Sequence, residues 1–335
     1  MKDIGRQYLN KLIDNFGKTR ILVIGDIMLD RFIWGKVSRI SPEAPVPIVE
    51  VEHETTMLGG AANVVNNIVS LGGNVLLSGV LGDDLVGREI ISKLEELDVD
   101  VSGIFIENDR PTTVKTRIIA HAQQVVRYDR EKRVSFKSHT INRFLNFIQE
   151  KKEDLSGIIL SDYGKGVVTR ELMNVVKKVM SDSKIPLAVD PNVKNFSLYK
   201  DVTIITPNHH QAGEVADMEI VDKESLRIVG EKLLHNQGCQ ALLITRGEDG
   251  MTLFEEDGKI THIKSMARQV YDVTGAGDTV IATLMLGIGS GLDLKSAAYL
   301  SNLAAGIVVG EVGTSTVRID NLKELIGRLE ISTTD

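Results

Sequence analysis

Apolar stretches alternate with segments of helical periodicity through the first third of the chain. Residues 20–25 form an essentially continuous apolar run, and apolar side chains recur at helical spacing in the segment that follows Gly59. An extended segment at 75–81 then precedes a second helical one at 90–97. A continuous apolar run is typical of a strand that is buried on both faces. The alternation therefore predicts βαβ units and a parallel sheet.

The same alternation resumes after about residue 140. Helices are expected at 141–148, 172–180, 277–287 and 295–309, and strands at 157–160, 186–190, 202–206 and 241–245. A short amphipathic helix is expected near the N-terminus, where apolar residues fall four apart at Ile4, Tyr8, Leu12 and Phe16. These elements predict an α/β fold, a doubly wound and mostly parallel sheet flanked by helices. Ligands bind such sheets beyond the carboxyl ends of the strands.

Two stretches, at about 32–57 and 104–128, interrupt this alternation. Both are rich in Val, Ile and Thr, contain turn residues and show no helical period. Because a βαβ segment separates them, we expect them to be excursions from a single domain spanning 1–335. Together they would form a small β-sheet lid over the active site. Prolines at 42, 45 and 47 make the first excursion's connector rigid and disfavour a helix there.

Composition narrows the functional classes. Hydrophobic residues make up 42% and charged residues 25% of the 335 residues, as in ordinary globular proteins. The net charge of −7 and the absence of a basic run disfavour nucleic acid and membrane surfaces as partners. The single cysteine, Cys239, excludes an intramolecular disulfide framework. With no run of 18 apolar residues and no signal-like N-terminus, a cytoplasmic location is expected.

The strongest local signal for chemistry is at residues 272–279, which read Asp-Val-Thr-Gly-Ala-Gly-Asp-Thr and precede an apolar helical run. Glycines at a helix N-terminus expose unpaired N–H groups, so Gly275, Ala276 and Gly277 are candidates for an anion hole. Asp278 in the same turn can accept a proton from an attacking hydroxyl, as phosphoryl transfer requires. The alternative is a simple turn with Asp278 as an ordinary acidic residue of a first helical turn.

These residues resemble the C-terminal signature of the ribokinase-like (PfkB) family of carbohydrate kinases. Residues 59–64 (Gly-Gly-Ala-Ala-Asn-Val) and 79–87 are similar to the family's N-terminal signature. The resemblance implies an ATP-dependent sugar kinase with Asp278 as catalytic base. It also implies that sugar hydroxyls are bound by Asp26, Asp30, Gly59, Gly60 and Asn63. Carboxylate and amide side chains suit such a polyol ligand, although the glycines could also serve only as a tight helix entry.

The nucleotide side of the site is also suggested by resemblance. Residues 245–250, directly after an apolar strand, are similar to the family's nucleotide loop, and Asn302 corresponds to its purine-side region. The residues expected to contact ATP are Asn208, Thr245, Gly247, Gly250 and Asn302. Without the resemblance, the two glycines could equally well only turn a hairpin.

One departure from the family concerns the divalent cation. The family usually has Asn-x-x-Glu after a central strand, and the Glu helps to place magnesium-bound water. Here the segment reads Asn208-His-His-Gln211, and a neutral amide cannot supply the same charge. Either Glu214 takes over or ATP itself chiefly holds Mg²⁺. The two histidines are not expected to bind a metal, because sequential side chains diverge and no third ligand lies nearby.

A monovalent cation, K⁺ above all, is a further expectation. In ribokinase-like enzymes the segments that match Asp272 and Thr274, and the turn at 310–315, supply oxygen atoms to such an ion. A cation there would hold the anion hole in place before reaction. The alternative is that these are two ordinary loops.

The lid segments narrow the choice of sugar substrate. Residues 26–35 and 38–47, together with 123–129 and 161–166, closely resemble the D-glycero-β-D-manno-heptose 7-phosphate kinases. Those enzymes make the 1,7-bisphosphate for ADP-heptose and the lipopolysaccharide core. The resemblance covers nearly the whole chain and implies phosphorylation of the anomeric hydroxyl. In the fused bifunctional form a nucleotidyltransferase domain follows the kinase, and we expect no such domain in these 335 residues.

Several basic residues are candidates for binding the 7-phosphate of this substrate. They are Arg39, Lys115, Arg117 and Lys165. The lid strands leave edges that need cover, so a homodimer through the lid is expected. Two rival functions stay open, namely a fructose 6-phosphate or ribose kinase of the same fold, and a non-catalytic nucleotide- or sugar-binding regulator, which Gln211 keeps in consideration.

Overall fold

The computed structural model describes residues 12–121, 123–132, 136–266, 273–310 and 315–331. Most of the N-terminal helix expected from Ile4 to Phe16 lies outside these ranges. So do Asp272 and residues 311–314 of the turn proposed for a monovalent cation. None of the described helices is both long and apolar enough to cross a lipid bilayer.

The main body is built on a large sheet whose strands have the order β13-β12-β11-β10-β9-β8-β1-β4-β5. Pairing is parallel from β5 to β11, whereas β12 and β13 are antiparallel. The strands are β1 (Arg20–Gly25), β4 (Asn74–Gly82), β5 (Ile104–Glu107), β8 (Gly157–Ser161), β9 (Leu187–Asp190), β10 (Ile204–Ile205), β11 (Ala241–Thr245), β12 (Met251–Glu255) and β13 (Ile260–Ile263). This confirms the doubly wound α/β fold; the strand expected at 202–206 shortens to the two residues of β10.

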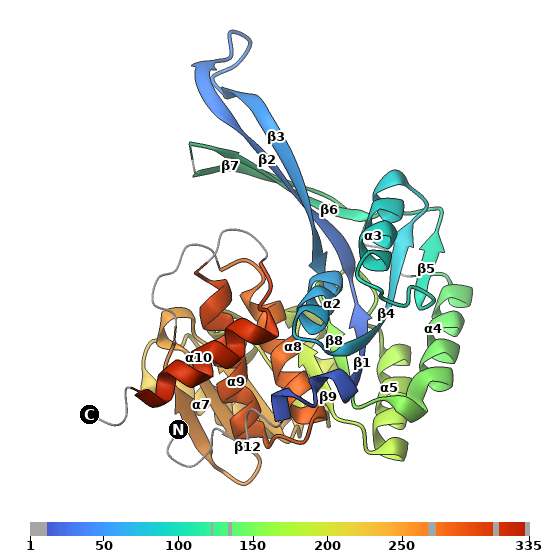
Figure 1. Cartoon of the computed structure of the whole chain (residues 1–335), viewed down its shortest axis with the longest axis vertical. Helices are drawn as coiled ribbons and strands as arrows, with labels where there is room; N and C mark the ends of the chain where they lie inside the picture. Colours follow the sequence, from blue (N-terminus) through green and yellow to red (C-terminus); the bar gives the residue numbers. More distant parts are fainter. Residues whose placement is uncertain (1–11, 122, 133–135, 267–272, 311–314, 332–335) are drawn as a thin grey trace.

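Helices cover both faces of this sheet (Figure 1). One face carries α2 (Ala61–Ser70), α3 (Leu85–Glu95), α8 (Ala276–Gly289), α9 (Leu294–Val308) and α10 (Ile319–Ile331). The other carries α4 (Ser138–Lys151), α5 (Arg170–Ser183), α6 (His209–Ala216) and α7 (Lys223–Gln237). Short 3₁₀ helices lie at η1 (Phe16–Lys18), η2 (Lys152–Asp154), η3 (Val193–Leu198) and η4 (Gly247–Asp249).

The alternation of side chains along the buried strands builds a separate core on each face. In β1, Ile21 and Val23 pack in the cluster with α2 and α8, whereas Leu22 and Ile24 pack in the cluster with α4 and α5. All four side chains are fully buried. This is why the strand reads as a continuous apolar run rather than an alternating one.

A second sheet, with the order β3-β2-β6-β7, projects from the body (Figure 1). Its strands are β2 (Ile27–Ile40), β3 (Pro47–Gly60), β6 (Thr113–Ala120) and β7 (Gln123–Arg130). Part of the second expected excursion lies elsewhere, because residues 104–107 form β5 and pair with β4 at the edge of the large sheet. Phe105 is buried there against Phe144 of α4, with ring centroids 4.9 Å apart. We call the four-stranded sheet the lid.

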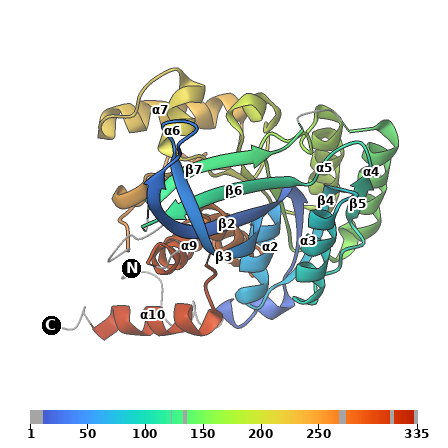
Figure 2. The ribbon, with the colours of Figure 1, turned by 90° about the horizontal axis from the view of Figure 1, so that it is seen from above.

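The chain connections place a site where β1 meets β8. From β1 the chain crosses to β4 on one side, while β8 leads to β9 on the other, so the winding direction reverses between them. Ligands bind at such a switch point, beyond the carboxyl ends of the strands. Asp26 follows β1 there and Tyr163 lies two residues after β8. Seen from above, the lid strands cross over this side of the body (Figure 2).

Candidate active site

Asp278 lies in the first turn of α8 and is almost completely buried, with 4% of its surface exposed. Its Oδ2 accepts a 2.7 Å hydrogen bond from Asn63 Nδ2, and its Oδ1 accepts one of 2.8 Å from Tyr163 Oη. Burial raises the pKa of the Asp278 carboxyl to about 6, against the lowering effect of these two hydrogen bonds. The group is therefore ionised at neutral pH and has an affinity for protons that suits a general base.

The backbone beside Asp278 offers hydrogen-bond donors. Gly275 caps α8 with a left-handed backbone (φ 80°), and the N–H of Ala276 already donates to Val273 O at 3.2 Å. The next two N–H groups, of Gly277 and Asp278, precede the first intrahelical bond and have no partner within the helix. A Cβ placed on Gly277 would have no atom within 4 Å, so the space in front of it is open. An anion can approach α8 here.

Asp30, Gly59 and Asn63 come together on the lid side of Asp278. Asp30 is buried and its Oδ1 accepts a 2.6 Å hydrogen bond from Arg117. A Cβ on Gly59 would lie 2.4 Å from Asp30 Oδ2, so this contact requires glycine. Asn63 Oδ1 is buried without a hydrogen-bond partner among the described residues. A hydroxyl-rich ligand can satisfy that oxygen.

Asp26 has a role that the sequence did not indicate. Its carboxylate accepts backbone hydrogen bonds from Tyr163 (2.9 Å), Lys165 (3.0 Å) and Val167 (3.3 Å). Burial raises its pKa to about 6 despite these donors. Gly60, with φ 57°, packs against Asp26, since a Cβ there would lie 2.4 Å from the Asp26 carbonyl oxygen. Asp26 therefore holds the loop after β8 in place through three hydrogen bonds.

Three of the four basic residues expected at the substrate phosphate have other environments. Arg39 is exposed near the end of β2. Lys165 forms an ion pair with Glu131 in which both side chains are largely buried. Arg117 is paired with Asp30. To bind a phosphate at the Asp278 site, Lys165 and Arg117 would each have to give up an ion pair, and Arg39 would have to move.

Lys115 is the fourth, and it differs from the others. Its ammonium group lies over the ring of Tyr163, 4.7 Å from the ring centroid. No carboxylate of the described residues is within ion-pair distance, although Asp30 is near enough to interact. Burial lowers the pKa of Lys115, and Asp30 partly offsets this. A half-buried ammonium without an ion pair is a strong candidate for binding an anionic ligand.

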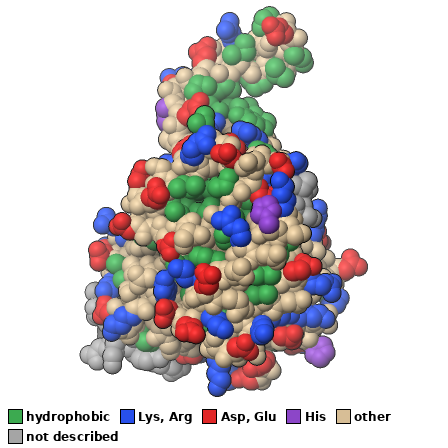
Figure 3. Space-filling view, turned by 90° about the vertical axis from the view of Figure 1, so that its right-hand side faces the viewer, with side chains coloured by type: hydrophobic (Ala, Val, Ile, Leu, Met, Phe, Trp, Pro, Cys, Tyr) green, Lys and Arg blue, Asp and Glu red, His purple; other side chains and the backbone are tan. Residues whose placement is uncertain are grey.

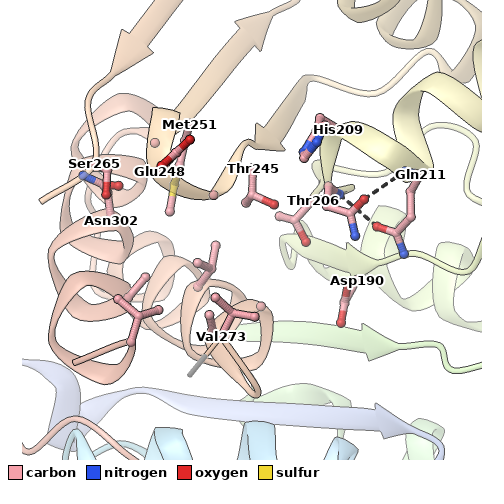
Figure 4. A pocket seen from close by; sticks show the side chains of 18 of the residues that line it. Asp190, Thr206, His209, Gln211, Thr245, Glu248, Met251, Ser265, Val273 and Asn302 are labelled. Carbon is pink, nitrogen blue, oxygen red and sulfur yellow. Dashed lines mark hydrogen bonds between the residues drawn. The ribbon is translucent and has the colours of Figure 1, made fainter. Parts of the chain in front are cut away.

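A cavity of about 670 Å³ opens beside the start of α8, where Ala276 and Gly277 line it (Figure 4). Its lining includes all five residues expected at the nucleotide, Asn208, Thr245, Gly247, Gly250 and Asn302. Apolar residues line much of the remainder, namely Met251, Val273, Ala276, Val280, Ala305 and Val309. Its size and mixed lining suit a nucleotide.

The segment that departs from the family has a structural use for Gln211. The side chains of Asn208 and Gln211 form a capping box at the start of α6, with bonds of 2.9 and 2.8 Å. Gln211 Nε2 also donates to Pro191 O at 3.0 Å. Glu214 is exposed on α6 and is not among the residues lining the cavity. The structure therefore does not bring Glu214 to the nucleotide side.

Asp190 and Tyr163 are the residues that the sequence-based interpretation did not single out as site residues. Asp190, at the end of β9, lines the cavity together with Tyr163 (Figure 4). Burial raises the pKa of Asp190 well above its usual range, as do the nearby carboxylates of Asp278 and Asp162. Asp190 ends one buried parallel strand and Tyr163 follows another, so their position at the carboxyl ends was the signal that could have found them.

No group of three or more His, Cys, Asp or Glu side chains with metal-site geometry occurs among the described residues. The rings of His209 and His210 lie against each other at the cavity wall, with their centroids 3.9 Å apart. Thr274 is described and directly precedes the cap of α8, whereas Asp272 lies outside the described residues.

Comparisons with known proteins agree with this geometry. A model of the pfkB family of carbohydrate kinases matches residues 18–321. Among curated relatives, the bifunctional protein HldE of Desulfatibacillum aliphaticivorans is 45% identical over 92% of this chain, and that of Sulfurimonas denitrificans is 42% identical over 97%. The chain spans 63% and 68% of the length of these relatives.

Solved structures with the same fold include two sugar kinases with bound ligands. Ribokinase of Arabidopsis thaliana, complexed with ribose and ATP, has a TM-score of 0.73 and 17% identity over 92% of this chain and 98% of its own. Phosphofructokinase-2 of Escherichia coli, in complex with substrates and products, has a TM-score of 0.78 and 16% identity over 93% and 100%.

Proposed function

We propose that this chain, which belongs to the pfkB family of carbohydrate kinases, phosphorylates the anomeric hydroxyl of D-glycero-β-D-manno-heptose 7-phosphate with ATP. The products would be ADP and the 1,7-bisphosphate, in the synthesis of ADP-heptose and the lipopolysaccharide core. The observation that carries the proposal is the place of Asp278, which is hydrogen-bonded both to Asn63 and to Tyr163, a residue that lines the nucleotide-sized cavity.

The chain's own groups can perform the transfer. Asp278 takes the proton of the anomeric hydroxyl as that oxygen attacks the γ-phosphorus of ATP. The bond from this phosphorus to the β,γ-bridging oxygen breaks, and ADP leaves. N–H groups of Gly277 and Asp278 at the start of α8 stabilise the charge on the transferring phosphoryl group. Asn63 Oδ1 and the Asp30–Arg117 pair position the sugar.

Mg²⁺ is the cation expected with ATP, and its chemistry is to neutralise phosphate charge. The cavity offers oxygen groups that suit such a hydrated cation, from Asp190, Thr206 and Asn208. Gln211 has both ends of its amide engaged, so it contributes to the helix start and not to the cation. We therefore expect ATP to hold the ion chiefly, with Asp190, whose ionised form the cation would favour, reaching it through water.

The heptose assignment rests on the lid and on Lys115. The lid segments resemble those of heptose 7-phosphate kinases, and Lys115 provides beside Tyr163 a positive charge that has no ion pair among the described residues. The curated relatives named HldE are bifunctional proteins, and this chain corresponds to about two thirds of them. A kinase that uses ATP and a phosphorylated sugar would act in the cytoplasm, as we propose here.

A monovalent cation remains part of the proposal. One solved structure of similar fold is phosphofructokinase-2 of Escherichia coli in complex with potassium. Thr274, just before the anion hole, and Asp272, outside the described residues, are the candidates in this chain. At fixed ionic strength and saturating Mg·ATP, replacing a bulky organic cation by K⁺ should raise the rate. Equal rates would remove the site from the proposal.

The test of the main proposal is a substrate panel. The protein would be incubated with Mg·ATP and heptose 7-phosphate, fructose 6-phosphate or ribose, and the products analysed by mass spectrometry and phosphorus NMR. A bisphosphate with its new phosphate on the anomeric oxygen, formed fastest from the heptose, is expected. A faster reaction with fructose 6-phosphate or ribose would make that sugar the substrate. No transfer to any sugar would favour a non-catalytic binding role.

A further inference from the structure

Tyr163 connects the separate parts of the site. Its backbone N–H donates to Asp26 at 2.9 Å, and its hydroxyl donates to Asp278 Oδ1 at 2.8 Å. The ammonium group of Lys115 lies over one face of its ring, and Tyr163 also lines the nucleotide cavity. No other described residue contacts Asp26, Asp278 and Lys115 together.

We propose that Tyr163 is a positioning residue for the proton transfer, whose hydroxyl fixes the Asp278 carboxylate in its reactive orientation and keeps it ionised. This inference rests on the proposed function, in which Asp278 is the base. It adds a residue outside the glycine-rich signature and the sugar-binding set.

The first argument is geometric. Asp278 is held at both oxygens, by Asn63 from α2 and by Tyr163 from the loop after β8. One hydrogen bond to each oxygen restricts rotation about the terminal side-chain torsion, which is otherwise broad for aspartate. Each carboxylate oxygen keeps a second acceptor position. The sugar hydroxyl can therefore meet a carboxylate in one fixed orientation, which is what efficient proton transfer needs.

The second argument is electrostatic. Several charged groups surround Asp278: Asp30 from the lid raises its pKa, Lys115 from the lid lowers it, and Asp190 from β9 is a further nearby carboxyl group. The hydroxyl of Tyr163 lowers the pKa of Asp278 by stabilising the ionised form. Tyr163 itself stays protonated, because burial and the carboxylate of Asp278 raise its own pKa well above the usual range. It therefore acts as a donor and not as a competing base.

A purely space-filling role for Tyr163 makes a different prediction. Tyr163→Phe keeps the ring, its packing and the contact with Lys115 while it removes only the hydroxyl. If the residue only fills space, this variant behaves as the wild type. If it positions Asp278 and keeps it ionised, the pKa of Asp278 should be higher in the variant than in the wild type.

The kinetic test measures kcat and KM from pH 5 to 9 for the wild type and Y163F. Because a hydrogen bond to a charged group is lost, the acid limb of the kcat profile should move up by about one pH unit. The loss of kcat should then be about tenfold at the acid end and smaller above the limb, with KM for ATP unchanged. An acid limb at the wild-type position would overturn the proposal.

Tyr199→Phe is the matched control. Tyr199 is fully buried, and its hydroxyl donates at 2.5 Å to a different carboxylate, that of Asp162. Its removal can lower stability, but it should leave the acid limb in place. A limb that moves equally in both variants would show a general effect of losing a buried hydroxyl and would also contradict the proposal.

A measurement without turnover separates this inference from the proposed function. Carbon-13 NMR of aspartate-labelled protein would follow the Asp278 carboxyl, assigned by its absence in D278N. Its titration midpoint should be higher in Y163F than in the wild type, whether or not the heptose is the substrate. An equal midpoint would overturn the role of Tyr163, whereas a shifted midpoint in an enzyme that phosphorylates another sugar would count only against the heptose.

Discussion

Asn63 and Asp278 are hydrogen-bonded at 2.7 Å although 215 positions separate them in the chain. One turn further along α2, Asn67 Oδ1 accepts a 2.8 Å hydrogen bond from Thr279 Oγ1, the residue next to Asp278 on α8. All four side chains are buried. Since α2 begins directly after the lid and α8 begins at the anion hole, these bonds fix the sugar side of the site against the phosphoryl side.

The first prediction concerns the base. Asp278→Asn should lower kcat roughly 10²- to 10⁴-fold, because a positioned general base contributes about that much. The fold and the KM for ATP should persist, since the amide has the same shape and can still accept from Asn63. Steady-state kinetics and a thermal melt would check this. Asp257→Asn, on an exposed turn, is the control and should retain wild-type turnover; a folded D278N with the parent rate would refute the assignment.

The second prediction follows from the cost of burying Asp278. Its pKa is raised from 3.8 to about 6, so the fold favours the protonated form. The stabilisation from this group is complete below pH 3.8 and is lost as pH rises through about 6. The shift of about two units corresponds to about 3 kcal/mol at most. Above pH 6, the wild type should therefore carry this cost, and D278N should not.

Urea denaturation at pH 4.5 and pH 7 measures this effect. The free energy of unfolding of the wild type relative to D278N should fall between the two pH values. Asp257→Asn is the matched control, because its exposed carboxyl has a lowered pKa and is ionised at both pH values. It should follow the wild type. A constant difference between the wild type and D278N would contradict the raised pKa of Asp278.

The sequence predicted the architecture well because its strands are buried on both faces. The run at 241–245 matches β11, and the helix expected at 277–287 lies within α8. It missed that residues 104–107 belong to the large sheet, since a short strand of Ile and Phe is equally compatible with either sheet. The choice depends on tertiary contacts, here those of Phe105 with α4.

For the site, residue type and position were predictable, but partners were not. Asp278, Asn63 and the cavity residues lie together as expected from the resemblance. The sequence could not show which basic residues lack an ion pair within the described chain, because Glu131 comes to pair with Lys165 only when distant segments fold together. The same holds for Asp26, whose three donors come from backbone N–H groups about 140 positions away.

The third prediction concerns Lys115. Lys115→Met should raise KM for the sugar phosphate about 10- to 100-fold, since a hydrogen bond between charged groups is lost. The effect should vanish for the same sugar without its 7-phosphate. Lys93→Met, on α3 and paired at the surface with Glu89, is the matched control and should not change KM. An unchanged KM for K115M would assign the phosphate to another residue.

The fourth prediction concerns the lid, which projects from the body with hydrophobic side chains on its surface (Figure 3). Val51 and Val126, on β3 and β7, are 56% and 48% exposed. We expect lids of two chains to cover each other in a homodimer. Sedimentation should show a dimer at micromolar concentration, and Val126→Asp should shift it to monomer. Val221→Asp, which changes a valine of the body that is 73% exposed, should stay dimeric; a wild-type monomer would contradict the prediction.

The last prediction concerns the choice of purine. Asn302 lines the cavity, and its Nδ2 donates to the carbonyl oxygen of Lys264 at 2.8 Å. Because a carbonyl oxygen can only accept, this bond fixes the amide orientation and leaves Oδ1 as an acceptor for the nucleotide. Adenine presents an amino donor where guanine presents an oxygen, so ATP should be preferred over GTP.

Asn302→Leu should remove this preference by raising KM for ATP while leaving KM for GTP nearly unchanged. A lost neutral hydrogen bond that discriminates between the two bases corresponds to roughly a 2- to 12-fold change in the ratio of their kcat/KM values. The matched control is Asn74→Leu, an exposed amide at the start of β4, far from the cavity lining, whose Nδ2 likewise donates to a backbone carbonyl, that of Gly17, at 2.7 Å. It should keep the wild-type ratio. Equal use of ATP and GTP by the wild type would show that Asn302 does not read the base.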